Sequence, residues 1–223
     1  MTQQAHETLE VGADCILEEP CLLGQTYEGW QQPLRIGNNA IIRPYAVIYC
    51  DTEIGNRFQC GYFVLIRARC RLADRVTLMS RVTLEGIVEV GSGTKIMAHV
   101  YVPSRTRLGS RVFVGPGVTF LNDRYPFRRD AASVKVLGAV VEDDVTIGGG
   151  CTIGPGLTIG KGSFIGAGSL VLKDVPPTTL AYGVPARYRP LPDDLCGGNR
   201  PEWMYPQTDL WGPYQDASWR PFE

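Results

Sequence analysis

Apolar residues recur at every sixth position over most of this 223-residue chain. Fifteen consecutive positions at this spacing, over 36–120, are all apolar. At 44% apolar content, chance gives such a run roughly a few times per million. The same step resumes over 141–171 and is also present, one residue out of phase, over 11–23. The residue after the apolar one is often glycine, and the residue four positions after it is small or β-branched.

This period excludes the two commonest regular structures. A helix does not place apolar residues at a strict step of six over this length, and a hairpin sheet shows a period of two. The pattern predicts short flat strands joined by tight corners, with the aliphatic residue pointing inward and glycine supplying the positive φ of the corner. The inward positions of the longest run are Ile36, Ile42, Ile48, Ile54, Cys60, Ile66, Leu72, Leu78, Leu84, Val90, Ile96, Val102, Leu108, Val114 and Phe120.

Hexapeptide repeats of this form resemble the left-handed parallel β-helix superfamily, in which three hexads make one triangular coil. The resemblance implies an all-β fold of about eight coils, stacked at about 4.8 Å per coil. It divides the chain into an N-terminal extension (1–10), the β-helix (11–176) with an inserted loop (121–139), and a C-terminal cap with an aromatic-rich tail (177–223). It also implies a homotrimer with ligand sites in the clefts between neighbouring prisms.

Composition narrows the function. The net charge of −1 argues against nucleic acid or a membrane surface as partner. The polar N-terminus has no signal-peptide core, and no stretch approaches the ~18 apolar residues of a membrane span, so we expect a cytoplasmic protein. Five of the seven cysteines fall on repeat positions, which predicts small buried side chains rather than disulfides or a zinc site. These are Cys15, Cys21, Cys60, Cys70 and Cys151.

The main interruption of the repeat spans 121–139 and displaces its register by fifteen residues. Insertions into a regular solenoid leave at its corners and are commonly functional. The stretch from His99 to Lys135 holds six Arg and one Lys against two Asp. A basic cleft would attract the polyanions coenzyme A or a nucleotide-linked sugar, although a solvated basic surface without a ligand stays open.

The segment 165–192 (IGAGSLVLKDVPPTTLAYGVPARYRPLP) closely resembles the end of hexapeptide acyltransferases. Together with VFVGPGVTFLNDRYP at 112–126, it is similar to the nucleotide-linked amino-sugar N-acetyltransferases of that superfamily. The resemblance covers about 11–192 and implies acetyl-CoA as co-substrate, with no metal required. The residues that it implies for the acceptor are Asn122, Asp123, Arg124 and Tyr125, and those for the coenzyme are Gly149, Ala167, Lys173 and Arg187.

His99 is the candidate catalytic base, since its motif position resembles the spot where amino-sugar acetyltransferases carry His or Asn beside the acceptor nitrogen. A neutral imidazole accepts a proton near pH 7. The implied reaction is direct attack of the acceptor amine on the thioester, with a backbone amide stabilising the oxyanion. A corner histidine that serves the backbone only is the alternative for this residue.

One other function known on the same fold is excluded, and two alternatives stay open. A carbonic anhydrase site needs three histidines on zinc, and the chain has two histidines. The main enzymatic alternative is an O-acetyltransferase of a small hydroxylated molecule. A non-catalytic β-helix scaffold or binding protein is the other. The tail from Asp193 to Glu223 carries three of the four Trp, and we expect it to pack on the prism or on a neighbouring subunit.

Overall fold

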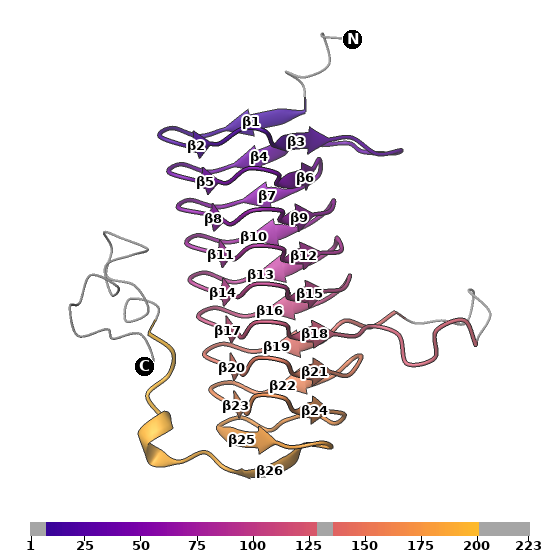
Figure 1. Cartoon of the computed structure of the whole chain (residues 1–223), viewed down its shortest axis with the longest axis vertical. Coiled ribbons are helices and arrows are strands. Elements are labelled where there is room, and N and C mark those ends of the chain that lie inside the picture. The colour runs from indigo at the N-terminus through magenta and orange to yellow at the C-terminus, as the bar shows by residue number, and fades with distance from the viewer. Residues whose placement is uncertain (1–7, 129–135, 201–223) are drawn as a thin grey trace, which may run out of the picture.

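The computed structural model of this chain describes residues 8–128 and 136–200, which form a tall three-sided prism (Figure 1). Almost every strand is two to four residues long and pairs in parallel with the strand one coil above and one coil below. The three sides are therefore three parallel sheets, and the chain climbs from one to the next at each corner. This is the predicted left-handed parallel β-helix.

Sheet A contains β1 (Leu9–Val11), β4 (Leu34–Ile36), β7 (Glu53–Ile54), β10 (Arg71–Leu72), β13 (Glu89–Val90), β16 (Arg107–Leu108), β19 (Val140–Val141) and β22 (Thr158–Ile159). Sheet B contains β2 (Ile16–Leu17), β5 (Ile41–Ile42), β8 (Gln59–Cys60), β11 (Thr77–Leu78), β14 (Lys95–Ile96), β17 (Phe113–Val114), β20 (Thr146–Ile147), β23 (Phe164–Ile165), β25 (Thr179–Tyr182) and β26 (Arg187–Pro190). Sheet C contains β3 (Leu22–Gln25), β6 (Val47–Tyr49), β9 (Leu65–Ile66), β12 (Thr83–Leu84), β15 (Tyr101–Val102), β18 (Thr119–Phe120), β21 (Thr152–Ile153) and β24 (Leu170–Val171).

The core is the inside of the prism. Every inward position predicted from Ile36 to Phe120 is buried, as is the resumed series from Val141 to Val171. The small residues that share each hexad, such as Ala40 and Val64, are fully buried as well. Only the first coil is open, with Val11 39% exposed, because no coil covers it from above. Sheets A and C each hold eight strands, so the predicted number of about eight coils is confirmed.

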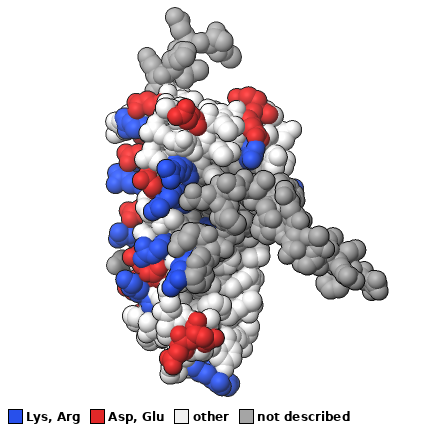
Figure 2. All heavy atoms as spheres, turned by 90° about the vertical axis from the view of Figure 1, so that its left-hand side faces the viewer, with Lys and Arg blue, Asp and Glu red and all other residues white. Residues whose placement is uncertain are grey.

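The outer surface of sheet A carries charges of alternating sign. Glu10 and Arg35 lie 2.9 Å apart, Glu89 and Arg107 lie 2.9 Å apart, and Glu53 and Arg71 lie 4.0 Å apart. Acidic and basic side chains alternate in the same way down one edge of the molecule in Figure 2. Each such exposed pair stabilises the fold by at most about 1 kcal/mol, so the main effect of the pattern is to keep this face solvated.

The outer surface of sheet C carries no charged side chain on its strands' outward positions, and that of sheet B carries Lys95 and, on the C-terminal strand β26, Arg187 and Arg189. Lys95 is half-buried, and this burial lowers its pKa to about 8. The outward positions of sheet C are Leu22, Val47, Leu65, Thr83, Tyr101, Thr119, Thr152 and Leu170. Two faces of the prism thus differ sharply in polarity from sheet A.

Both insertions of the described chain leave at the corner that joins sheet C to sheet A, here called the C–A corner. Leu23 and Ile36 are thirteen positions apart instead of six, so seven residues are inserted between β3 and β4. The sequence showed this insertion only as a phase shift of one residue, because seven exceeds the repeat by one. The second insertion is the predicted loop between β18 and β19.

The C-terminal cap turns back across the last coil. β25 adds to sheet B in parallel, and β26 pairs with β25 in the antiparallel sense. A short 3-10 helix follows (η2, Asp193–Leu195), and Asn199 then docks on the prism. Its side-chain amide donates to the backbone oxygens of Arg111 and Val145 at 2.8 and 2.9 Å. The aromatic residues of the predicted tail, at 201–223, lie outside the described residues.

The cysteines divide into two groups. Cys60, Cys70 and Cys151 are buried, as the repeat predicts, and all seven thiols are free. The expectation was wrong for Cys15 and Cys21, which are half-buried because they belong to the open first coil.

Candidate functional site

The corner that joins sheet B to sheet C, here called the B–C corner, loses its side chains in the lower half of the prism. The last residue of this corner is Gly117, Gly150 and Gly168 in three successive coils, with φ between 67° and 70°. A Cβ added at any of these three glycines would meet nothing within 4 Å. The edge is therefore a strip of bare backbone that faces open space, which suits close approach of an extended ligand.

Gly149 and Ala167 lie on this strip, each one residue before a corner glycine. Gly149 O accepts from Gly168 N at 2.9 Å, which places the two residues in neighbouring coils. The amide N–H groups of Gly149 and Ala167 donate no hydrogen bond within the described part of the chain. The coenzyme role predicted for these two residues stays a prediction.

His99 occupies the same corner one coil above Gly117. Its imidazole is exposed, its backbone is left-handed (φ 61°), and its amide donates to Ser80 O at 3.1 Å. Gly117 N in turn donates to Ala98 O at 2.9 Å. The structure thus brings three of the predicted site residues, His99, Gly149 and Ala167, onto one edge of the prism.

The predicted acceptor residues lie elsewhere, at the neck of the loop on the C–A corner. Asn122 donates to Ser104 Oγ at 3.2 Å, and its backbone oxygen accepts from Leu137 N at 2.8 Å. These contacts make Asn122 the residue that closes the neck of the loop. Asp123 accepts from the backbone N–H of Tyr125 at 2.8 Å, which forms a turn that carries Arg124 outward. Arg124 and Tyr125 are exposed.

The described residues of the loop and His99 do not meet within one chain. His99 precedes β15 and Asn122 follows β18, and β15 and β18 are paired neighbours in sheet C. The two residues therefore lie on opposite edges of the same sheet. Their nearness in sequence, little more than one coil, does not make them neighbours around the prism.

The two basic residues predicted for the coenzyme lie near the base of the prism. Arg187 is the first residue of β26 and pairs with Tyr182 of β25. The Cβ atom of Tyr182 lies beside Gly166, which places this pair at the B–C corner. Lys173 follows β24 and belongs to the C–A side, and its backbone oxygen accepts from the Tyr188 hydroxyl at 2.8 Å. Arg187 is thus placed below the bare strip, whereas Lys173 stands apart from it.

The predicted basic cleft does not form as a single feature. Arg107 pairs with Glu89 on sheet A at 2.9 Å. Arg111 donates to both carboxylate oxygens of Asp144, at 2.7 and 2.8 Å, at the corner that joins sheet A to sheet B. A solenoid distributes residues that are close in sequence over three faces. Basic residues that cluster along the sequence therefore need not cluster on the folded surface. Arg129 and Lys135 lie outside the described residues.

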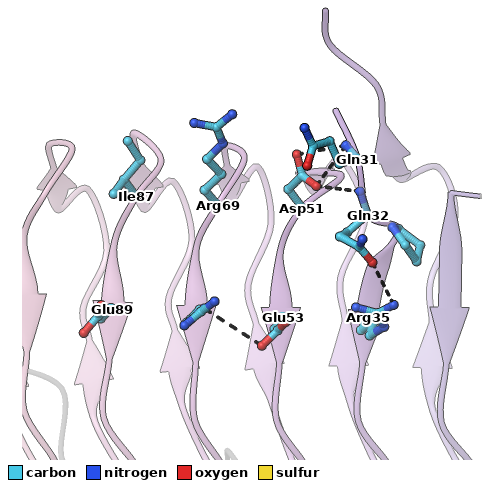
Figure 3. A pocket seen from close by; sticks show the side chains of 10 residues that line it. Gln31, Gln32, Arg35, Asp51, Glu53, Arg69, Ile87 and Glu89 are labelled. Carbon is cyan, nitrogen blue, oxygen red and sulfur yellow. Dashed lines mark hydrogen bonds and ion pairs between the residues drawn. The ribbon is translucent and has the colours of Figure 1, made fainter. Parts of the chain in front are cut away.

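A groove of about 410 Å³ lies under the first insertion, and no sequence pattern predicts it. Figure 3 shows two rows of side chains: Asp51, Arg69 and Ile87 along the C–A corner, and Arg35, Glu53 and Glu89 on sheet A below them. Asp51 ties the insertion down.

The carboxylate of Asp51 accepts a hydrogen bond from the Tyr27 hydroxyl and another, at 2.6 Å, from the backbone N–H of Gln32. Burial acts to raise the pKa of Asp51, but these hydrogen bonds prevail and hold it below its usual value. Charges of both signs line the groove: Glu53 and Arg71 lie 4.0 Å apart within it, whereas Arg35 and Glu89 pair with residues outside its lining.

Within 8–128 and 136–200, no helix has the length and hydropathy needed to cross a membrane. In the same residues, no group of three or more His, Cys, Asp or Glu side chains is arranged to hold a metal ion.

Comparison with known proteins addresses the family. The family model described as bacterial transferase hexapeptide (six repeats) matches residues 138–173. A solved hexapeptide-repeat acetyltransferase from Vibrio cholerae, in complex with acetyl coenzyme A, is 30% identical over 62% of this chain and 70% of its own, with a TM-score of 0.47. This chain belongs to the hexapeptide-repeat transferases. The predicted family is thereby confirmed.

Two curated relatives are also similar to this hexapeptide-repeat transferase. The bifunctional protein GlmU of Nitrosomonas eutropha is 29% identical over 51% of this chain and 22% of its own length. An acyl-[acyl-carrier-protein]–UDP-N-acetylglucosamine O-acyltransferase of Rickettsia peacockii is 39% identical over 26% of this chain and 22% of its own. The chain thus spans about a fifth of the length of the curated relatives it matches.

Proposed function

We propose that this hexapeptide-repeat transferase moves an acetyl group from acetyl coenzyme A to the amino group of an amino sugar, in particular a nucleotide-linked one. The observation that carries this proposal is the bare strip of the B–C corner, which begins directly below the exposed imidazole of His99. An extended pantetheine arm fits such a strip, and its thioester end then lies beside a group able to accept a proton. The acetyl coenzyme A in the Vibrio cholerae structure supports this choice of donor.

The chemistry follows from these groups. The acceptor amine attacks the thioester carbonyl, and a free backbone N–H on the strip stabilises the oxyanion. His99 takes the proton that the amine loses, and the coenzyme leaves as its thiol. A buried thiol does not compete as nucleophile, because burial raises the pKa of Cys60 to about 12 and that of Cys70 to about 11.

The acceptor side is assembled between subunits in this proposal. His99 and the loop residue Asn122 stand on opposite edges of sheet C, so the loop of one prism reaches the B–C corner of its neighbour. The sparsely charged faces of sheets B and C give adjacent prisms surfaces to pack against, whereas the charged face of sheet A stays in water. A homotrimer brings each B–C corner beside a neighbouring prism in this way.

The Rickettsia peacockii relative is named as an O-acyltransferase, and this favours a second candidate, transfer to a hydroxyl. A hydroxyl is a weaker nucleophile at neutral pH than a deprotonated amine and depends more on its base. Removal of His99 would therefore cost more for a hydroxyl acceptor than for an amine.

A free-thiol assay of coenzyme A release tests the proposal, with acetyl-CoA and amino sugars in free and nucleotide-linked form, each beside the same sugar bearing a hydroxyl. We expect turnover with an amine, and a loss of more than about 100-fold in kcat for His99→Ala. The matched control is Asn39→Ala, which removes a side chain from an equally left-handed corner position (φ 58°) on another edge. Turnover only with hydroxyl acceptors would replace the proposal by its alternative.

A further inference from the structure

The B–C corner carries side chains above His99 where it carries glycine below. The last corner residue is Tyr45, Phe63 and Arg81 in the three coils that precede His99, each eighteen residues from the next. All three have left-handed backbone, with φ of 65°, 58° and 63°. A non-glycine residue there costs about 1 kcal/mol or more, which the glycines of the lower coils avoid.

These side chains are stacked in a fixed order. The Tyr45 and Phe63 rings are parallel within 5°, with centroids 4.8 Å apart. The guanidinium carbon of Arg81 lies 5.3 Å from the centre of the Phe63 ring. His99 comes next, because its amide donates to Ser80 O in the coil of Arg81. From the top, the edge therefore presents two rings, a guanidinium, an imidazole and then bare backbone.

Arg81 differs from the arginines of sheet A in its charge environment. Arg35, Arg71 and Arg107 each have a carboxylate within 4.0 Å, whereas no ion pair to Arg81 forms among the described residues. Its side chain is exposed, and one face of its guanidinium is covered by Phe63. Stacking on a ring holds the planar group and leaves its N–H edges for bidentate binding of a carboxylate or phosphate.

We propose that Arg81 binds an anionic group of the acceptor, a carboxylate or phosphate, one coil from His99. The direction along the edge assigns this role. The bare strip runs from His99 toward Arg187, away from Arg81, so the coenzyme occupies the lower side and the acceptor the upper side. One coil corresponds to about 4.8 Å, a reach that fits an anionic substituent close to the atom that receives the acetyl group. Phe63 and Tyr45 position the guanidinium.

This inference rests on the proposed function and makes it more specific, because it predicts an anionic acceptor. The test is the thiol-release assay with three related acceptors: glucosamine, glucosamine 6-phosphate and muramic acid. The first is uncharged apart from its amine, the second adds a phosphate and the third adds a carboxylate. We expect kcat/KM of the wild type to be at least about tenfold higher for one of the anionic acceptors than for glucosamine.

The variants separate recognition from other roles. Arg81→Gln should raise the KM for the anionic acceptor at least about tenfold, and raise the KM for glucosamine and for acetyl-CoA much less. Arg81→Lys should fall between the two, because it keeps the charge and loses the bidentate fork. Arg75→Gln is the matched control, an exposed arginine at an equally left-handed corner position (φ 59°) of another edge.

Four outcomes overturn the inference: a wild type that uses glucosamine as well as the anionic acceptors, an unchanged acceptor KM in Arg81→Gln, a raised KM for acetyl-CoA instead, or a changed oligomeric mass in light scattering. The last would make Arg81 a subunit contact. Absence of turnover with these three acceptors and with the nucleotide-linked amino sugars of the first assay, in contrast, is a failure of the proposed function itself.

Discussion

His99 and Asn122 stand on opposite edges of sheet C, although only twenty-three positions separate them. One residue lies between His99 and β15, and one lies between β18 and Asn122, so the paired strands span the whole distance between them. A site that needs both residues is incomplete in a single prism.

Subunit mixing tests this relationship. We expect His99→Ala and Asp123→Ala each to be inactive alone, and a refolded equal mixture of the two to recover activity. If each site takes its histidine from one subunit and its loop from the next, about one quarter of the sites in random trimers hold two intact partners. The thiol-release assay then reads about a quarter of the wild-type rate. No recovery in the mixture would place both residues in the same subunit's site or show that one of them is dispensable.

A bulky side chain on the bare strip should block the coenzyme and spare the fold. Ala167 is exposed at the B–C corner, so Ala167→Trp projects an indole over the path proposed for the pantetheine arm. We expect the KM for acetyl-CoA to rise at least about tenfold, with an unchanged melting temperature.

The matched control for this change is Ala13→Trp. Ala13 is also exposed and also precedes a left-handed corner residue, Asp14 (φ 56°), but it lies on another edge. Equal effects of the two substitutions on acetyl-CoA would remove the strip from the coenzyme site.

The fold was predictable from the sequence because each coil repeats the same physical problem. Inward positions such as Ile42 and Ile147 must be aliphatic in every coil, so the period of six survives over the length of the prism. The face or corner of the prism on which a residue lies was harder to predict from the sequence. Arg107 and Arg111 are four residues apart in sequence yet pair with acids on two different sides.

The candidate site was predicted in part. His99, Gly149 and Ala167, to which the resemblance gave roles in one reaction, lie on one edge, whereas the described part of the acceptor loop lies on another edge of the same chain. The column of Tyr45, Phe63 and Arg81 was missed, although stepping back from His99 by eighteen residues finds all three. The groove under the first insertion was hidden for a different reason, since an insertion of seven residues looks like a slip of one.

The pair formed by Arg111 and Asp144 should support the fold in a pH-dependent way. The hydrogen bond and charge of Arg111 hold the pKa of Asp144 below its usual value, although burial opposes this. Such a carboxylate contributes stability that is present above the pKa of the unfolded chain, about 3.9, and is lost as the pH falls through the lower folded value.

We therefore expect Asp144→Asn to lower the free energy of unfolding at pH 7 by about 1 kcal/mol, with the difference from wild type narrowing below about pH 4. Urea titrations at pH 7 and pH 3 measure this. Asp14→Asn, at a similar corner position without an ion pair among the described residues, should change little. A difference that stays constant between the two pH values would contradict the assignment.

The cysteines should differ widely in reactivity. At pH 8, raised pKa values of about 12 and about 11 leave Cys60 and Cys70 almost entirely as thiols, and both are buried. Cys196 is exposed. Brief treatment with iodoacetamide, followed by peptide mass spectrometry, should therefore label Cys196 and leave Cys60 and Cys70 unmodified, with acetyl transfer retained. Early labelling of Cys60 together with inactivation would argue for a covalent route.

Because both insertions leave at the C–A corner, the B–C edge runs without interruption through every coil of the described prism. The distance between functional groups along that edge can change only by whole coils, in steps of about 4.8 Å. A variant that gains eighteen residues between Arg81 and His99 would move the two groups apart by one further coil and leave both on the B–C corner. The length of the acceptor, rather than its chemistry, would then be the property that such an edge selects.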